Sequence, residues 1–193
     1  MLRGHIVLQL PPLLLLLPII VLSSPGDAAA DVGGVCALTQ HQSVCKRSMA
    51  PFSGTERQSP HWWARVAVSV TIAETRKVAL YLARLKRSGR LGSGAVGALS
   101  DCVECFDEAL RLLGGALGEL RRLRRRSFGW QTSKVQTWVS AALTDEQTCL
   151  DGFIGVAAAP PAALLRGRVR KVTYLASNAL AFVNNLASSG GGK

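Results

Sequence analysis

Residues 135–153 read VQTWVSAALTDEQTCLDGF, and their pattern indicates an amphipathic helix that carries a cysteine. The apolar side of this helix, at spacings of three, four and seven residues, is formed by Val135, Trp138, Ala142, Cys149 and Phe153. Because this stripe needs an apolar partner, the stretch predicts a packed helical core rather than an isolated helix.

A second amphipathic helix lies directly upstream and has the clearest periodicity in the chain. Its apolar stripe, at steps of three and four, consists of Leu99, Cys102, Phe106, Leu110, Leu113, Leu117, Leu120 and Leu123. Gly114, Gly115 and Gly118 weaken this helix locally, and they either allow a close neighbour or permit some bending.

Two further segments predict helices. Pro60 opens the stretch 61–90, which has no internal proline or glycine before Gly89. Pro160 and Pro161 mark a break, after which residues 164–188 form a last helix. One face of that helix holds Val169, Val172, Ala176, Ala179, Val183 and Leu186. No strand pattern is visible, so we predict an all-α fold built on an antiparallel up-down-up-down four-helix bundle.

The first 30 residues have the order of a secretory signal, with Arg3, then an apolar run, then small residues at 28–30. A membrane-spanning helix is the competing interpretation, but Pro11, Pro12 and Pro18 interrupt the run. We therefore expect a signal peptide at 1–30, a helical domain at 31–188 and a flexible tail at 189–193. The expected location is outside the cell, with no membrane attachment after cleavage.

The chain has five cysteines, and an oxidising compartment would let disulfides form. A bridge across the short interval between Cys36 and Cys45 would pin a local turn or helical hairpin. Cys102 and Cys149 lie on the inward stripes of neighbouring helices, where a bridge would join the two. Cys105 is left over, because an odd number of cysteines cannot all pair within one chain.

The net charge of +11 predicts attraction to polyanions, and a dense cluster of arginines concentrates it. This cluster consists of Arg121, Arg122, Arg124, Arg125 and Arg126. An acidic polysaccharide or an acidic protein surface fits a secreted protein better than nucleic acid does. The alternative is a solvated helix end, where cations are favoured in any case.

No catalytic or metal-binding constellation is visible, so we expect neither an enzyme nor a cofactor. Cys102 and Cys105 form a C-x-x-C pair without the strand-helix context of a redox motif. His41 and His61 are not at metal-ligand spacing from a second cysteine pair. The adjacent acids Asp107–Glu108 and Asp145–Glu146 are expected to lie on solvated helix surface rather than to perform acid-base catalysis.

Several motifs together resemble the plant invertase/pectin methylesterase inhibitor family. Cys36, Thr39 and Cys45 match the C-x2-T-x5-C signature of its N-terminal hairpin. Residues 101–110, DCVECFDEAL, resemble its DC-x-E-x-Y-x-D-A-V segment, and residues 135–153 are similar to its third bundle helix almost residue for residue. VTYLASNALAFVN at 172–184 resembles the closing helix. The chain departs from the family around His41-Gln42, where Tyr-Pro is usual, and in its dense basic tract.

The resemblance implies an N-terminal helical hairpin before the bundle, with disulfides Cys36–Cys45 and Cys102–Cys149 and a free thiol at Cys105. It also implies a secreted inhibitor of the apoplast and cell wall that forms a reversible one-to-one complex over the substrate cleft of its target. Such a protein would regulate pectin methylesterification. The residues expected to contact the target are Gln136, Ser140, Thr144, Asp145 and Thr148.

Pectin methylesterase is the expected target, because the third-helix pattern is typical of its inhibitors. The Pro-Lys-Phe element of invertase inhibitors is absent between the second and third bundle helices. Two alternatives stay open: an inhibitor of cell-wall or vacuolar acid invertase, and a basic pectin-binding wall protein that inhibits nothing.

Overall fold

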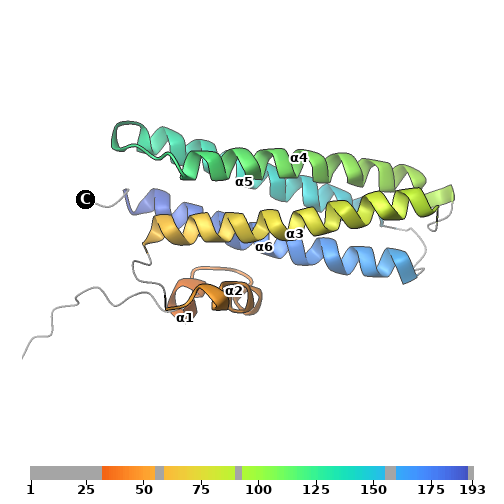
Figure 1. Ribbon diagram of the computed structural model, residues 1–193, viewed down its shortest axis with the longest axis horizontal. Coiled ribbons are helices and arrows are strands. Elements are labelled where there is room, and N and C mark those ends of the chain that lie inside the picture. The colour runs from red at the N-terminus through yellow and green to blue at the C-terminus, as the bar shows by residue number, and fades with distance from the viewer. Residues whose placement is uncertain (1–31, 55–58, 90–92, 155–159, 191–193) are drawn as a thin grey trace, which may run out of the picture.

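The computed structural model describes residues 32–54, 59–89, 93–154 and 160–190 (Figure 1). The predicted signal peptide and the last residues of the predicted tail, 191–193, lie outside these ranges. The described parts of the chain are all-α, as the sequence predicts, and contain no β-strand. None of the described helices is both long enough and apolar enough to cross a membrane.

The fold is an N-terminal hairpin of two short helices followed by a bundle of four long ones (Figure 1). The hairpin helices are α1 (Val32–Cys36) and α2 (Gln42–Met49). The bundle helices are α3 (Pro60–Ser88), α4 (Val96–Leu120), α5 (Phe128–Asp151) and α6 (Pro160–Ser188). Short 3-10 turns lie at Ala50–Phe52 (η1), Ser93–Ala95 (η2) and Arg125–Ser127 (η3). Each long helix packs on its neighbours in sequence, and α6 closes the ring on α3, which gives the predicted up-down-up-down order.

Local chemistry accounts for both ends of α3 and for the start of α6. Ser59 caps α3, because its hydroxyl accepts a hydrogen bond from the Trp62 amide at 3.2 Å. Gly89 ends the helix in the left-handed conformation, at φ +62°, which glycine adopts without strain. The prediction that Pro160–Pro161 precedes the last helix needs correction, because α6 begins at Pro160. Proline suits a first helical turn, whose amides have no intrahelical partner.

The bundle core follows the predicted stripes. The stripe positions of α6 from Val169 to Leu186 are all buried. In α4, five of the stripe positions are buried, whereas Leu110 and Leu117 are partly buried and pack at the edge of the core. Leu123, predicted as part of the same helix, lies beyond its end and is also partly buried. Helix α5 starts at Phe128, seven residues before the predicted start. Residues 128–134 contain no proline, and the single Gly129 in the first turn is tolerated. Trp138, predicted as core, is only half-buried.

Both expected disulfides are present, and Cys105 is the free cysteine. Cys36 and Cys45 join α1 to α2 across a sequence separation of 9, with Cα atoms 5.7 Å apart. Cys102 and Cys149 join α4 to α5 across a separation of 47, at 4.5 Å. All four bridged cysteines are buried, so each bridge cross-links a core rather than a surface loop.

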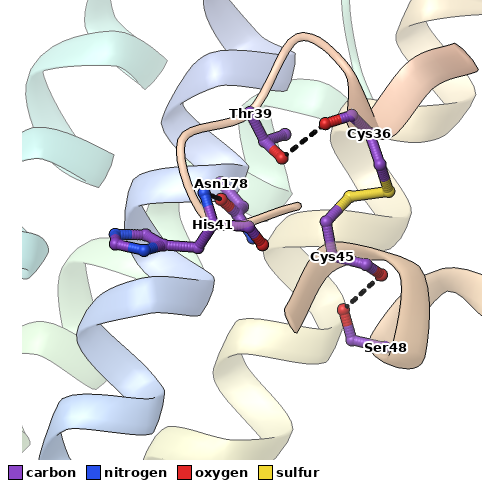
Figure 2. Close-up of a disulfide and its surroundings, with 6 residues drawn as sticks. All are labelled: Cys36, Thr39, His41, Cys45, Ser48 and Asn178. Carbon is purple, nitrogen blue, oxygen red and sulfur yellow. Dashed lines mark hydrogen bonds between the residues drawn. A yellow bond between two sulfur atoms is a disulfide. The ribbon is translucent and has the colours of Figure 1, made fainter. Parts of the chain in front are cut away.

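The hairpin is held on the bundle by Asn178 of α6 (Figure 2). The Asn178 Oδ1 atom accepts a hydrogen bond from the His41 amide at 3.1 Å, and its Nδ2 donates to the His41 carbonyl oxygen at 3.1 Å. The His41 ring also stacks on Tyr174, with ring centroids 3.8 Å apart. Thr39, buried beside the disulfide, donates to the Cys36 carbonyl oxygen at 2.8 Å. His41 lies where the chain departs from the Tyr-Pro of the family it resembles. It is therefore the residue through which the hairpin docks on α6.

Candidate functional site

The exposed face of α5 brings three of the predicted contact residues together. Ser140, Thr144 and Thr148 are exposed and spaced four residues apart, so they follow one another along one side of the helix. Thr144 Oγ1 donates to the Ser140 carbonyl oxygen at 3.1 Å, and Thr148 Oγ1 donates to the Thr144 carbonyl oxygen at 2.9 Å. These bonds fix the hydroxyls against their own helix and leave the oxygen lone pairs facing solvent.

The other two predicted contact residues lie at opposite edges of that face. Gln136 lies on the α6 side, where its Nε2 donates to Asn184 Oδ1 at 2.9 Å. Asp145 lies on the α4 side, where its carboxylate feels the charges of Glu108 and Arg111. The five predicted residues therefore span the outward face of α5 from one neighbouring helix to the other. Sequence reasoning missed Asn184, because no local pattern shows which α6 residue meets Gln136.

Asp145 is a half-buried carboxyl rather than a freely solvated one. Burial raises its pKa above the ordinary value of 3.8, and the nearby Glu108 charge acts in the same direction. Arg111 opposes the effect, but Arg111 is already paired with Glu108 through two hydrogen bonds. One Asp145 oxygen is buried without a hydrogen-bond partner among the described residues.

Glu146 contradicts the prediction that both adjacent acids are solvated, because it is fully buried in the bundle core. Burial raises its pKa from 4.5 to about 8, and the charge of Asp145 adds to the rise. Its Oε1 lies 3.3 Å from the hydroxyl of Thr75 on α3, and its Oε2 has no partner among the described residues. Thr75 already donates its one proton to the Thr71 carbonyl oxygen at 2.8 Å, so a protonated Glu146 can donate to Thr75.

The arginine cluster lies where α4 ends and α5 begins. All five of its arginines are exposed, and no carboxylate of the described residues forms a salt bridge with them. Arg122 fits the helix-end interpretation in part, because its Nε donates to the Gly118 carbonyl oxygen at 3.2 Å. The other four side chains are exposed and form no salt bridge with a described residue.

A buried glutamine, missed by sequence reasoning, shapes this connection. Gln131 Oε1 accepts from the Arg124 amide at 2.9 Å and from the Ser127 hydroxyl at 3.0 Å. Its Nε2 donates to Glu119 at 3.0 Å and to the Arg122 carbonyl oxygen at 3.1 Å. The backbone that carries the arginines is therefore fixed by one side chain of α5.

The α4–α5 contact is close because Gly115 faces Trp138. A Cβ atom at Gly115 would lie 3.1 Å from the indole ring, which is tighter than ordinary packing. Lys134 lies over the Trp138 ring at 4.8 Å and over the exposed Trp130 ring at 4.3 Å, and it pairs with Glu119 at 2.7 Å. The sequence left open whether the glycines of α4 allow a close neighbour or permit bending. At Gly115 the structure shows a close neighbour, Trp138.

The described residues contain no group of three or more His, Cys, Asp or Glu side chains placed to hold a metal ion. The chain instead matches a family of inhibitors: the model described as plant invertase/pectin methylesterase inhibitor covers residues 30–182. The chain belongs to this family. It is 39% identical to pectinesterase inhibitor 6 of Arabidopsis thaliana over 160 residues, which are 82% of this chain and 76% of that protein.

The chain is also similar to other known proteins. The chain is 33% identical to the 21 kDa protein of Daucus carota over 177 residues, which are 90% of this chain and 92% of that protein. It also matches a crystal structure of a mutant form of a pectin methylesterase inhibitor from Arabidopsis, with a TM-score of 0.67 and 20% identity. That match covers 81% of this chain and 97% of the other, and it confirms the fold alone. The family is one of inhibitors rather than enzymes, as the sequence predicts.

Proposed function

We propose that the protein inhibits pectin methylesterase by forming a reversible one-to-one complex in which the exposed face of α5 covers the substrate cleft. The observation that carries this proposal is the row of Ser140, Thr144 and Thr148, flanked by Gln136 and Asp145. These residues belong to the stretch that most resembles the family's third helix. Relatives named pectinesterase inhibitors support the choice of target over invertase.

The face suits a protein partner because its polar groups are already ordered. The Thr144 and Thr148 hydroxyls are held by their own helix, and the Gln136 amide is held by Asn184. Side chains fixed before binding lose little conformational entropy in a complex, so more of the contact energy contributes to affinity. Disulfide Cys102–Cys149 joins the last turns of α5, next to Thr148, to α4.

Introducing long charged side chains at Thr144 tests the interface. We expect Thr144→Glu and Thr144→Arg each to raise the inhibition constant about tenfold or more, because a charge at the centre of a packed interface is either clashing or left unpaired. Ala73 of α3 provides the matched control, since it is exposed and α3 lies diagonally across the bundle from α5. Unchanged inhibition by both Thr144 variants, with Ala73→Glu and Ala73→Arg as reference, would remove α5 from the interface.

The complex would operate outside the cell, which follows from the secretory pattern of residues 1–30 and the disulfides of the folded domain. Inhibition of acid invertase is the second candidate, because the family description names both enzymes. The absence of a Pro-Lys-Phe element in residues 121–138 favours the esterase. A titration against both enzymes separates the two.

A further inference from the structure

Two pockets lie at the end of the bundle where α3 begins and α4 passes into α5. The larger has a volume of about 340 Å³ and is lined by His61, Arg124, Arg125 and Phe128 together with leucines of α4–α5 and α6. Because His61 belongs to the first turn of α3, the pocket lies beside the start of that helix. It combines two guanidinium groups with an aromatic and aliphatic wall.

The second pocket, of about 230 Å³, lies beside the same turn of α3. Its lining includes Trp62, Phe52, Arg65 and Arg121, so it repeats the pairing of arginines with aromatic rings. The two pockets flank consecutive residues of α3, His61 and Trp62. Arg121 of the smaller pocket is three and four residues from Arg124 and Arg125 of the larger one, so the two pockets lie near each other along the α4–α5 connection.

The charge at these subsites is uncompensated by the described residues. Neither pocket has a carboxylate among its lining residues, and Arg65, Arg121, Arg124 and Arg125 take part in no salt bridge with a described residue. The nearest acid of the connection, Glu119, is already held by Lys134 and Gln131. Guanidinium groups without a carboxylate partner are suited to carboxylate ligands, which they bind through paired N–H donors.

We propose that this end of the bundle is a second binding site, which holds an oligomer of uronic acid with one carboxylate-bearing sugar in each pocket. The arginines would bind the carboxylates, and Phe128 and Trp62 would contact the apolar faces of the sugar rings. The choice of galacturonate rests on the proposed function, since removal of methyl esters from pectin leaves free carboxylates on its sugars. The site would hold the inhibitor on wall material that the target has already processed.

The site is separate from the proposed inhibitory face. Ser140, Thr144 and Thr148 lie in the middle and later turns of α5, whereas the pockets adjoin the beginning of α5 and the first turns of α3. At 1.5 Å per residue, Gln136 is roughly 12 Å and Thr144 roughly 24 Å along the helix from Phe128. Both ligands could therefore be bound at the same time.

Calorimetric titration with an oligogalacturonate of about ten units, without any esterase present, tests the proposal. We expect R124Q/R125Q and R65Q/R121Q each to weaken binding about tenfold or more, because each pair removes the carboxylate donors of one pocket. The matched control is R84Q/R87Q, which removes the same charge from exposed positions at the opposite end of α3. It should change binding by less than about twofold at physiological ionic strength, where distant charges are screened.

The fully methyl-esterified oligomer and poly-L-glutamate of similar carboxylate number complete the experiment. The proposal predicts that both bind at least about tenfold more weakly than the free acid, since one lacks the charge and the other lacks the sugar faces. Equal losses in all three double variants, equal binding of poly-L-glutamate, or no binding by the wild-type protein would overturn the site. Because no esterase is present, these outcomes do not depend on whether the protein inhibits one.

Discussion

Replacing Glu146 by glutamine should abolish a pH dependence of stability that the folded protein otherwise has. In the native state burial holds the pKa of Glu146 at about 8, whereas the unfolded chain has the ordinary 4.5. Between these values the folded protein binds the extra proton, so the free energy of unfolding falls as pH rises. With 1.36 kcal/mol per pKa unit, the expected loss between pH 5 and pH 7 is on the order of 2–3 kcal/mol.

Two other carboxyls, Glu74 and Asp145, also have shifted pKa values. Salt bridges to Lys77 and Lys171 hold the pKa of Glu74 below 4.5 although burial opposes them, so its contribution is complete above that pH and is lost in more acidic solution. The pKa of Asp145 is raised from 3.8, so this carboxyl also makes the free energy of unfolding fall as pH rises. Its effect begins at lower pH than that of Glu146, because its pKa in the unfolded chain is lower. Stability should therefore be highest in mildly acidic solution.

Urea unfolding of the wild type and two variants at several pH values from 5 to 8 measures the effect. In Glu146→Gln the amide can donate to Thr75 as the protonated acid does, and it does not titrate, so the unfolding free energy should stay nearly level. Asp107→Asn, at an exposed position of α4, is the control and should keep the wild-type fall. An equal fall in Glu146→Gln and the wild type would refute the assignment to this carboxyl.

Two further substitutions test the packing. Asn178→Ala should lower the free energy of unfolding by about 2 kcal/mol, because both His41 backbone groups lose their partners. Hydrogen exchange should show faster opening of residues 32–49. Unchanged exchange there would contradict the docking role of Asn178. Gly114→Ala should stabilise the protein by roughly 0.5–1 kcal/mol, since nothing lies within 4 Å of the added methyl. Gly115→Ala should not give this stabilisation, because the added methyl would be too close to the Trp138 ring. Equal melting temperatures for the two glycine variants would argue against the close contact.

The fold was predictable because its strongest signals are local and periodic. The stripes of α4 and α6 repeat at three and four residues over many turns, and a buried stripe of that length is specific to a helix. The disulfides followed from the family motifs rather than from spacing alone, since five cysteines allow many pairings. The start of α5 at Phe128 was missed because its inward positions before Val135 are the polar Gln131 and Thr132, and because Gly129 disfavours a helix.

The site was predictable only in part, because contacts between distant residues leave no local pattern. The spacing of Ser140, Thr144 and Thr148 places them on one face, and this follows from helical geometry. The burial of Glu146 could not be deduced in the same way, because adjacent acids on a helix usually face water. Likewise, no sequence signal indicated that Gln131 would fix the basic connection.

The central claim is that the protein inhibits pectin methylesterase, and parallel titration of this esterase and an acid invertase with purified oxidised protein tests it most directly. At mildly acidic pH, we expect esterase activity to fall linearly to an end point at one inhibitor per enzyme, with invertase activity unchanged. Loss of invertase activity alone, or no effect on either enzyme, would contradict the account.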